Sequence, residues 1–175
     1  GALMGKITLN EINPEHLYAV LQKLKEVGAL VETTSNSVTI EPGDLKPVDM
    51  RTAVYPGFAT DLQAQWVALM SLADGSSMVT DTVYHDRFSH VPELNRFGAN
   101  IKVDKNTAFI RGVKELVGAP VMSTDIRASA ALIIAALAAN GQTEVSRVYH
   151  IDRGYERIEE KFRKLGAEIS RVNFR

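Results

Sequence analysis

The chain repeats itself, and this internal repeat constrains its fold more than any other feature. Three segments share the pattern of a helix that ends at Gly-Ala and is followed by a strand. They are Leu17–Glu32, Val91–Lys102 and Ile158–Ser170. In each, an apolar residue stands four positions before the glycine, another directly before it, and a β-branched residue three positions after it. The recurrence predicts one supersecondary unit that is built more than once.

The glycines of this pattern are Gly28, Gly98 and Gly166. Helices often end at a residue in the left-handed conformation, which glycine adopts at little cost. We therefore expect a positive φ angle at all three positions. A strand is expected directly after each of them.

A second pattern interleaves with the first. Thr60-Asp-Leu-Gln-Ala64 and Thr124-Asp-Ile-Arg-Ala128 each open a helical run that ends near a glycine, Gly75 or Gly141. A strand is expected after each of these glycines. Combined, the two patterns give a unit of strand, helix, strand, helix, strand, strand. The predicted fold class is α/β (α+β), built from repeated βαβαββ units.

The units are not equally complete. The middle copy, at about 48–113, has every element, whereas the first, at about 6–41, lacks the opening strand and helix. The last copy, at about 120–172, lacks at most its final strand. A missing strand and helix leave an unpaired strand edge and an uncovered apolar face. We infer that the chain is part of a larger protein, or that it associates to cover the gap. The alternative is that the first copy is simply degenerate.

Composition narrows the classes of function. The 175 residues carry a net charge of −1, which gives no general electrostatic reason to bind nucleic acid or an anionic membrane. The absence of cysteine excludes disulfides, Cys-ligated zinc and a thiol nucleophile within this chain, and fits a cytosolic protein. The longest apolar run, Ala130–Ala139, is about half of what a membrane helix needs. Gly1-Ala-Leu-Met4 lacks the features of a signal peptide.

Two aspartates stand at expected helix starts. Thr60 followed by Gln63 fits a capping box, and an aspartate there suits the helix dipole. Asp61 can therefore be a capping residue. The functional alternative is a carboxylate that accepts a proton or holds a substrate hydroxyl. Asp125 has the same two interpretations.

Three arginines also lie at or just before expected helix starts, namely Arg87, Arg127 and Arg153. A cation near the positive end of a helix is mildly unfavourable. An anion held between the arginine and the free backbone N–H groups reverses that effect, so the placement favours a cluster that binds phosphate or carboxylate. The alternative is that each arginine pairs with an aspartate one or two residues away.

The remaining candidates favour structural roles. His85 and His90 are not spaced as a metal site on one helical face. Trp66, Leu69 and Met70 share a helix face that is expected to be core. The helix at 128–139 is apolar all round and is expected to be central and buried.

Four longer runs carry a resemblance to a known family. They closely resemble the UDP-N-acetylglucosamine 1-carboxyvinyltransferases, a group of enolpyruvyl transferases, and the similarity extends from about Gly5 to the end of the chain. The runs are Tyr55-Pro-Gly-Phe-Ala-Thr-Asp-Leu-Gln-Ala-Gln65, His90-Val-Pro-Glu-Leu-Asn-Arg-Phe-Gly-Ala99, Val121-Met-Ser-Thr-Asp-Ile-Arg-Ala-Ser-Ala130 and Tyr149-His-Ile-Asp-Arg-Gly-Tyr-Glu-Arg-Ile-Glu-Glu160.

The resemblance implies an inside-out α/β barrel domain of three such units, here incomplete at its N-terminal side. The 1–175 chain would be the C-terminal domain fragment of a two-domain bacterial cytoplasmic enzyme. That enzyme transfers enolpyruvyl from phosphoenolpyruvate to the 3′-hydroxyl of UDP-N-acetylglucosamine and releases phosphate, at the first committed step of peptidoglycan synthesis. No metal or organic cofactor is implied.

The resemblance also implies roles for individual residues. Asp61 matches the family's carboxylate at the sugar hydroxyl, a candidate general base. Val83 matches a contact to the UDP-sugar, and Asp125 matches an aspartate beside the reacting centre. Three positions match arginines near phosphoenolpyruvate or important for closure, namely Arg87, Arg127 and Arg153.

The chain also departs from the family. The reactive cysteine and the Lys-Asn substrate motif of the family belong to parts that are absent here, and His85-Asp86 differs from the expected acidic-polar pair. We therefore expect no turnover from the chain alone. The alternative is a non-enzymatic half-domain that binds UDP-sugars or a partner protein. An RNA-processing cyclase of related fold is a third option that the charge does not support.

Overall fold

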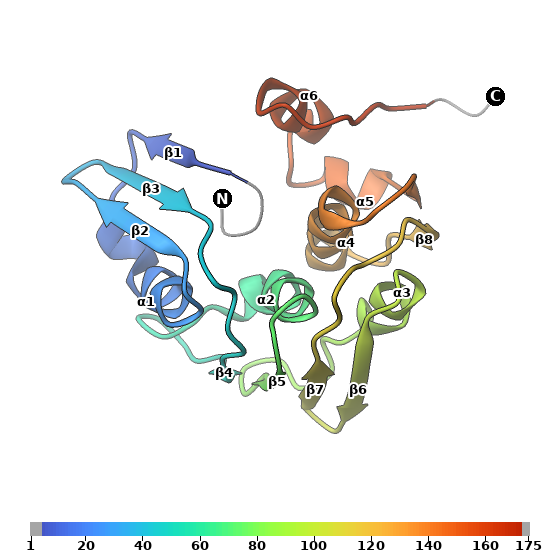
Figure 1. The fold of residues 1–175 in the computed structure, drawn as a ribbon, viewed down its shortest axis with the longest axis horizontal. Coiled ribbons are helices and arrows are strands. Elements are labelled where there is room, and N and C mark those ends of the chain that lie inside the picture. Colours follow the sequence, from blue (N-terminus) through green and yellow to red (C-terminus); the bar gives the residue numbers. More distant parts are fainter. Residues whose placement is uncertain (1–4, 173–175) are drawn as a thin grey trace.

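The structure is a computed structural model that describes residues 5–172, so the signal-peptide prediction for Gly1–Met4 lies outside it. These residues fold into three small sheets with helices between them (Figure 1). Each sheet belongs to one copy of the repeat. The mixed α/β class predicted from the sequence is confirmed.

The middle copy contains all six predicted elements. It consists of β4 (Met50–Arg51), a 3₁₀ turn (Thr60–Leu62) that leads into α2 (Gln63–Met70), β5 (Ser76–Thr80), α3 (Val91–Arg96), β6 (Asn100–Asp104) and β7 (Thr107–Arg111). The strand order is β4-β5-β7-β6. β4 runs parallel to β5, and β7 is antiparallel to both of its neighbours.

The other two copies are subsets of this arrangement. The first has β1 (Ile7–Asn10), a 3₁₀ turn (Pro14–Leu17), α1 (Tyr18–Glu26), β2 (Leu30–Thr33) and β3 (Ser37–Glu41). Its order β1-β3-β2, antiparallel throughout, reproduces β5-β7-β6. The third copy has β8 (Pro120–Met122), α4 (Ile126–Ala138) and β9 (Glu144–Ser146), and its parallel β8-β9 pair reproduces β4-β5.

The end of the third copy differs from the prediction. Short α5 (Tyr149–Asp152) was not expected, and α6 (Ile158–Lys164) is followed by no strand among the described residues. Within residues 120–172, the third copy therefore shows neither of its two final strands, whereas only the last was expected to be missing. The physical reason is pairing: β2 and β6 bond to β3 and β7, whereas residues 167–172 have no such partner in the described chain. Arg171 instead bonds to Asp152 at 2.7 Å.

The glycine prediction is confirmed at all three positions. The φ angles are 103° at Gly28, 88° at Gly98 and 92° at Gly166, and each residue follows the last turn of α1, α3 or α6. Two of these helices then lead into the predicted strand. The glycine therefore ends the helix in every copy, whether or not a strand follows.

Two helices form the centre of the core. α2 and α4 pack against each other, and the buried apolar side chains of α2 share one hydrophobic cluster with Ala131, Leu132 and Ala135 of α4. Ile133 of α4 belongs to a second, smaller cluster. As predicted, α2 buries Trp66, Leu69 and Met70. The ring of Trp66 packs edge-on against that of Phe58, with the ring centroids 5.4 Å apart. Residues 128–133 and 135 of α4 are buried, whereas residues 134 and 136–139 are only partly buried, so the predicted burial of the 128–139 helix is confirmed for its first half.

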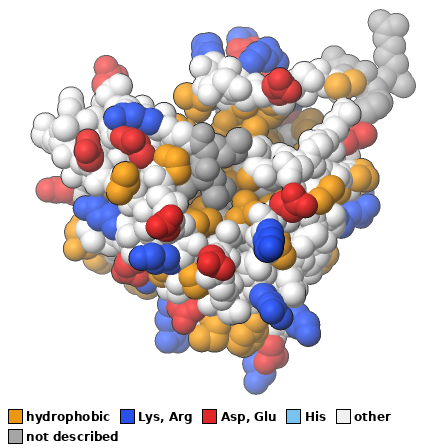
Figure 2. Space-filling view, in the orientation of Figure 1, with side chains coloured by type: hydrophobic (Ala, Val, Ile, Leu, Met, Phe, Trp, Pro, Cys, Tyr) orange, Lys and Arg blue, Asp and Glu red, His pale blue; other side chains and the backbone are white. Residues whose placement is uncertain are grey.

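An apolar groove remains open beside these helices. Its volume is about 340 Å³, and hydrophobic side chains gather below α6 on this face (Figure 2). β1 lies at a sheet edge, where the complete copy has β4 beside the equivalent strand β5. An uncovered apolar face and a strand edge are what the missing opening elements predicted. The groove is lined mainly by Gln65, Ala130, Ile134, Tyr155, Ile158, Phe162 and Leu165.

The glycines at the helix ends give a stability test. A Cβ at Gly28 would overlap the carbonyl oxygen of Asp44, whereas a Cβ at Gly98 would meet no atom within 4 Å. Gly98→Ala should lower the free energy of unfolding by about 1–2 kcal/mol, the cost of the left-handed backbone alone. Gly28→Ala should cost clearly more, because the 43–44 backbone must also move. Urea denaturation measures both, and equal losses would contradict the close packing at Gly28.

Candidate functional site

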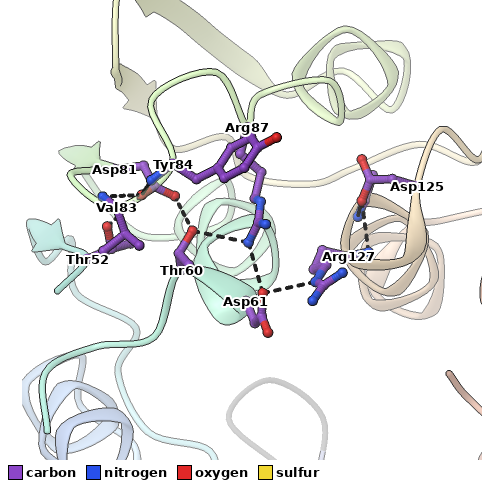
Figure 3. A network of polar contacts seen from close by, with 10 residues as sticks. Thr52, Thr60, Asp61, Asp81, Val83, Tyr84, Arg87, Asp125 and Arg127 are labelled. Atoms are coloured by element: carbon purple, nitrogen blue, oxygen red, sulfur yellow. Dashed lines mark hydrogen bonds and ion pairs between the residues drawn. The ribbon is translucent and has the colours of Figure 1, made fainter. Parts of the chain in front are cut away.

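One carboxylate joins two arginines from different copies of the repeat. Asp61 lies just before α2, and its Oδ1 accepts a hydrogen bond from Arg87 Nη1 at 2.8 Å and another from Arg127 Nε at 3.0 Å. Arg87 lies in the loop before α3, and Arg127 lies in the first turn of α4 (Figure 3). The structure thus brings together three of the residues that the sequence singled out.

The local pairing alternative for the arginines is wrong. Neither Arg87 nor Arg127 forms an ion pair with its neighbouring aspartate; both pair with Asp61. Asp152 pairs with Arg171. Arg153 is exposed at the end of α5 and, among the described residues, forms no ion pair. The structure therefore does not join Arg153 to this cluster.

The capping box predicted at Thr60 is also wrong. Ala59 holds the N-cap position of the 3₁₀ turn, and neither this turn nor α2 has a side-chain cap. The Thr60 hydroxyl donates to Asp81 Oδ2 at 2.6 Å instead. Gln63, the other half of the expected box, is fully buried and its amide atoms find no partner within the described chain. Asp61 is thus free of a capping role and faces the arginines.

Asp125, in contrast, is the capping residue that the sequence allowed. Its Oδ1 accepts from the backbone N–H groups of Arg127 and Ala128 at 2.9 and 3.0 Å. Its Oδ2 accepts from Ser89 Oγ at 2.8 Å. This cap fixes the start of α4 and therefore the place from which the Arg127 side chain extends toward Asp61.

Sequence reasoning missed a buried carboxylate at the edge of this cluster. Asp81 has no exposed surface and follows β5 directly. Its oxygens accept from the hydroxyls of Thr52 and Thr60 and from the backbone N–H groups of Val83 and Tyr84 (Figure 3). A signal was present: Ser77 and Val79 are the inward positions of β5, so the alternation places residue 81 inward as well.

The surroundings lower the pKa of all three carboxyl groups. Hydrogen bonds from Arg127 and then Arg87 hold the pKa of Asp61 below its usual range, against a partial burial that raises it. Burial raises the pKa of Asp81 and Asp125, but the N–H and O–H groups that donate to them outweigh it. Asp61 is therefore an ionised, solvent-reachable carboxylate with two guanidinium groups, which themselves suit a phosphate or carboxylate ligand.

Among residues 5–172, no group of three or more His, Asp or Glu side chains is placed to hold a metal ion. His85 is exposed, and His90 is buried beside Phe88. In the same part of the chain, no helix has the length and apolarity to cross a membrane.

Comparison with known proteins places the chain in a family. The sequence profile of EPSP synthase (3-phosphoshikimate 1-carboxyvinyltransferase) matches residues 1–162. The chain belongs to the EPSP synthase family. Within it, the UDP-N-acetylglucosamine 1-carboxyvinyltransferase of Chlorobium chlorochromatii is 56% identical over 171 residues, and that of Hydrogenovibrio crunogenus is 56% identical over 169. The resemblance read from the sequence motifs is confirmed.

The family relation covers only part of these enzymes. The match spans 97% of this chain but about 40% of the Chlorobium relative. Among solved structures, the enolpyruvyl transferase NikO from Streptomyces tendae superposes on 95% of the chain and 40% of its own, with a TM-score of 0.85 and 28% identity. EPSP synthase from Acinetobacter baumannii, at 19% identity and a TM-score of 0.62, shares the fold.

The buried histidine beside the site gives a prediction on pH. Burial lowers the pKa of His90 to about 4, although the charge of Asp125 opposes this. The unfolded chain takes up this proton near pH 6.5 and the folded chain only near pH 4, so folding stability should fall as the pH drops between these values. The loss should be roughly 1–3 kcal/mol.

His90→Phe should remove this part of the pH dependence, since the ring stays and the titration is lost. Exposed His85→Asn is the matched control and should retain the wild-type slope. Urea denaturation at a series of pH values between 7 and 4 measures both variants. An unchanged slope in His90→Phe would show that His90 does not cause the loss.

Proposed function

We propose that this chain supplies one face of the active site of an enolpyruvyl transferase. The finer proposal is transfer of enolpyruvyl from phosphoenolpyruvate to the 3′-hydroxyl of UDP-N-acetylglucosamine, the first committed step of bacterial peptidoglycan synthesis. The observation that carries it is Asp61 held between Arg87 and Arg127, at 2.8 and 3.0 Å, in a chain of this family.

The proposal includes a partner for the chain. We propose that residues 1–175 are the C-terminal domain fragment of a two-domain enzyme and complete an inside-out α/β barrel with its remaining part. The open groove of about 340 Å³ and the 40% coverage of the Chlorobium relative support this. The enzyme is proposed to work in the bacterial cytoplasm without metal or organic cofactor, since the reaction needs only proton transfer and anion binding.

The chemistry assigns different tasks to the arginines and to the carboxylate. Phosphoenolpyruvate carries a phosphate and a carboxylate, and arginine binds both through paired, charge-assisted hydrogen bonds. In the transfer, the bond from the enol carbon to the phosphate oxygen breaks and a bond to the sugar oxygen forms. The hydroxyl must lose its proton on the way, and Asp61 is the proposed acceptor. A proton is added to the enolpyruvyl methylene carbon as the sugar oxygen bonds, and one is lost again from the resulting methyl group as the phosphate leaves. The donor of this proton has to come from the remaining part of the enzyme.

The resting cluster also suggests how Asp61 is activated. An aspartate whose pKa is lowered by two arginines is a weak base. Binding of an anion between the same guanidinium groups would draw them away from Oδ1 and would place a second negative charge beside Asp61. Both effects raise the pKa of the carboxyl group. The base would therefore gain strength when phosphoenolpyruvate is in place.

The other sequence-predicted residues take supporting parts in the proposal. Val83 is half exposed on the turn before Arg87 and is proposed to contact the UDP-sugar. Asp125 is proposed to lie beside the reacting centre, where it also caps α4. Arg153 is proposed to meet phosphoenolpyruvate only when the complete site closes, because in this structure it stays outside the Asp61 cluster.

The activation of Asp61 can be measured in the 175-residue chain. Adding inorganic phosphate should raise the pKa of Asp61. Carbon NMR of the carboxyl groups over a pH titration measures this pKa. Asp152 is an internal control, because it lies outside this cluster and forms a similar ion pair with Arg171, whose Nη2 is 2.7 Å from Asp152 Oδ1. This ion pair likewise lowers the pKa of Asp152. A rise at both aspartates would indicate non-specific screening, and no rise at Asp61 would contradict the proposed anion site.

Activity needs the remaining part of the enzyme. The chain alone should release no phosphate from phosphoenolpyruvate above a substrate-free blank, and activity should return when the missing portion of a family member is added or fused. In that complemented enzyme, Asp61→Asn should lower kcat far more than it weakens substrate binding. Asp152→Asn should leave turnover unchanged. Tight UDP-sugar binding by the chain alone, with no activity on complementation, would favour the non-enzymatic module instead.

A further inference from the structure

Asp81 is a buried carboxylate to which nothing so far assigns a task in the site. It has no exposed surface, and no arginine, lysine or histidine pairs with it among the described residues. Four neutral donors satisfy it at 2.6 to 3.0 Å: two threonine hydroxyls and two backbone N–H groups. A buried charge is expensive unless it is fully hydrogen-bonded, so these four groups are held firmly in place.

Asp81 reaches Arg87 by a first route through Thr60. Asp81 Oδ2 accepts a hydrogen bond from the Thr60 hydroxyl at 2.6 Å. Because the hydroxyl proton points toward Asp81, the lone pairs of the Thr60 oxygen are left to accept from another donor. Arg87 Nη1 then donates to the same Thr60 oxygen at 3.2 Å. The nitrogen that bonds to Thr60 is also the one that bonds to Asp61 Oδ1 (Figure 3).

A second route passes through Tyr84. Oδ1 accepts the backbone N–H of Tyr84 at 2.8 Å and that of Val83 at 3.0 Å, and these bonds shape the turn after β5. The ring of Tyr84 lies under the guanidinium of Arg87, with its centroid 4.5 Å from Cζ. A cation at this distance is attracted to the ring face. One buried carboxylate therefore holds both the edge and the face of the same guanidinium group.

We propose that Asp81 is a positioning residue that orients Arg87 for the anionic substrate through Thr60 and the ring of Tyr84. The inference rests on the proposed function, since it deepens the role of the same arginine. Asp81 itself touches neither substrate nor reacting atoms. Its effect is to restrict Arg87 before the anion arrives, so that less conformational freedom is lost on binding.

Electrostatics alone predicts the opposite outcome, which makes the proposal testable. Asp81→Asn removes a negative charge two hydrogen bonds from Arg87, and by Coulomb's law an anion should then bind more tightly. If Asp81 positions Arg87, the asparagine amide presents an N–H toward Thr60 and breaks the series of hydrogen bonds from Arg87 through Thr60 to residue 81. Anion binding then weakens. The dissociation constant for inorganic phosphate should rise about tenfold, the effect of one lost hydrogen bond to a charged group.

The experiment uses the 175-residue chain with inorganic phosphate as the probe. Asp49→Asn is the matched control, because exposed Asp49 also accepts a backbone N–H of β5, that of Met78 at 2.7 Å, and lies outside the Arg87 network. Val38→Ala, a truncation at a fully buried site in β3, controls for lost stability alone. Both controls should keep the wild-type dissociation constant.

Nitrogen NMR of the Arg87 guanidinium gives a readout that needs no ligand. Restricted rotation should give separate Nη signals in the wild type and in both controls, and these should merge in Asp81→Asn. Thr60→Val removes the first route without changing any charge, so the Arg87 signals should merge in this variant too. If Asp81→Asn does not fold, Thr60→Val alone tests whether Arg87 is positioned through Thr60. The double variant should be no worse than Asp81→Asn alone, because that substitution already affects the route through Thr60.

The outcomes separate the two proposals. If the wild type binds no phosphate but the Arg87 signals merge in the variants, the proposed anion site fails and the positioning by Asp81 stands. If the wild type binds phosphate and Asp81→Asn binds it equally or more tightly with separate Arg87 signals, the positioning proposal is overturned. Asp81 would then be a structural residue only.

Discussion

The packing of α2 against α4 is the contact on which the rest of the structure depends. Both helices are apolar on nearly all sides, and together they hold the middle and last copies of the repeat in one core. Their first turns carry or adjoin Asp61 and Arg127. Because the helices start side by side, a carboxylate and a guanidinium that are 66 residues apart in the chain meet at 3.0 Å. The site is thus a consequence of helix packing between repeat units.

The polar groups are arranged in layers around this contact. Asp81 is fully buried, Thr60 and Arg87 are partly covered, and Asp61 is the most exposed member. Asp81 has no counter-ion among the described residues, so its charge must be satisfied by neutral hydrogen-bond donors. These donors fix the turn after β5, the Thr60 hydroxyl and the Tyr84 ring beside Arg87. An ordered arginine next to solvent is preorganised to bind an anion.

The local features of the fold were predictable from the sequence. The glycine positions, the buried faces of α2 and α4 and the repeat unit follow from backbone conformation and hydrophobic periodicity. The site residues were chosen mainly by resemblance, because local reasoning left two interpretations open: a cap or a functional carboxylate for Asp61, and an anion-binding cluster or local ion pairs for the arginines. The capping box and the local ion pairs both failed for the same reason: Thr60 and Arg87 bond to residues that only tertiary packing brings near. The strand expected after Gly166 failed because a strand needs a partner.

The proposed function requires that Arg87 and Arg127 exchange Asp61 for an anion. A crystal structure of the chain grown with inorganic phosphate tests this most directly. We expect a phosphate between the two guanidinium groups, with at least one of them withdrawn from Asp61 Oδ1. A phosphate bound elsewhere, with both arginines still 2.8 to 3.0 Å from Asp61, would contradict it.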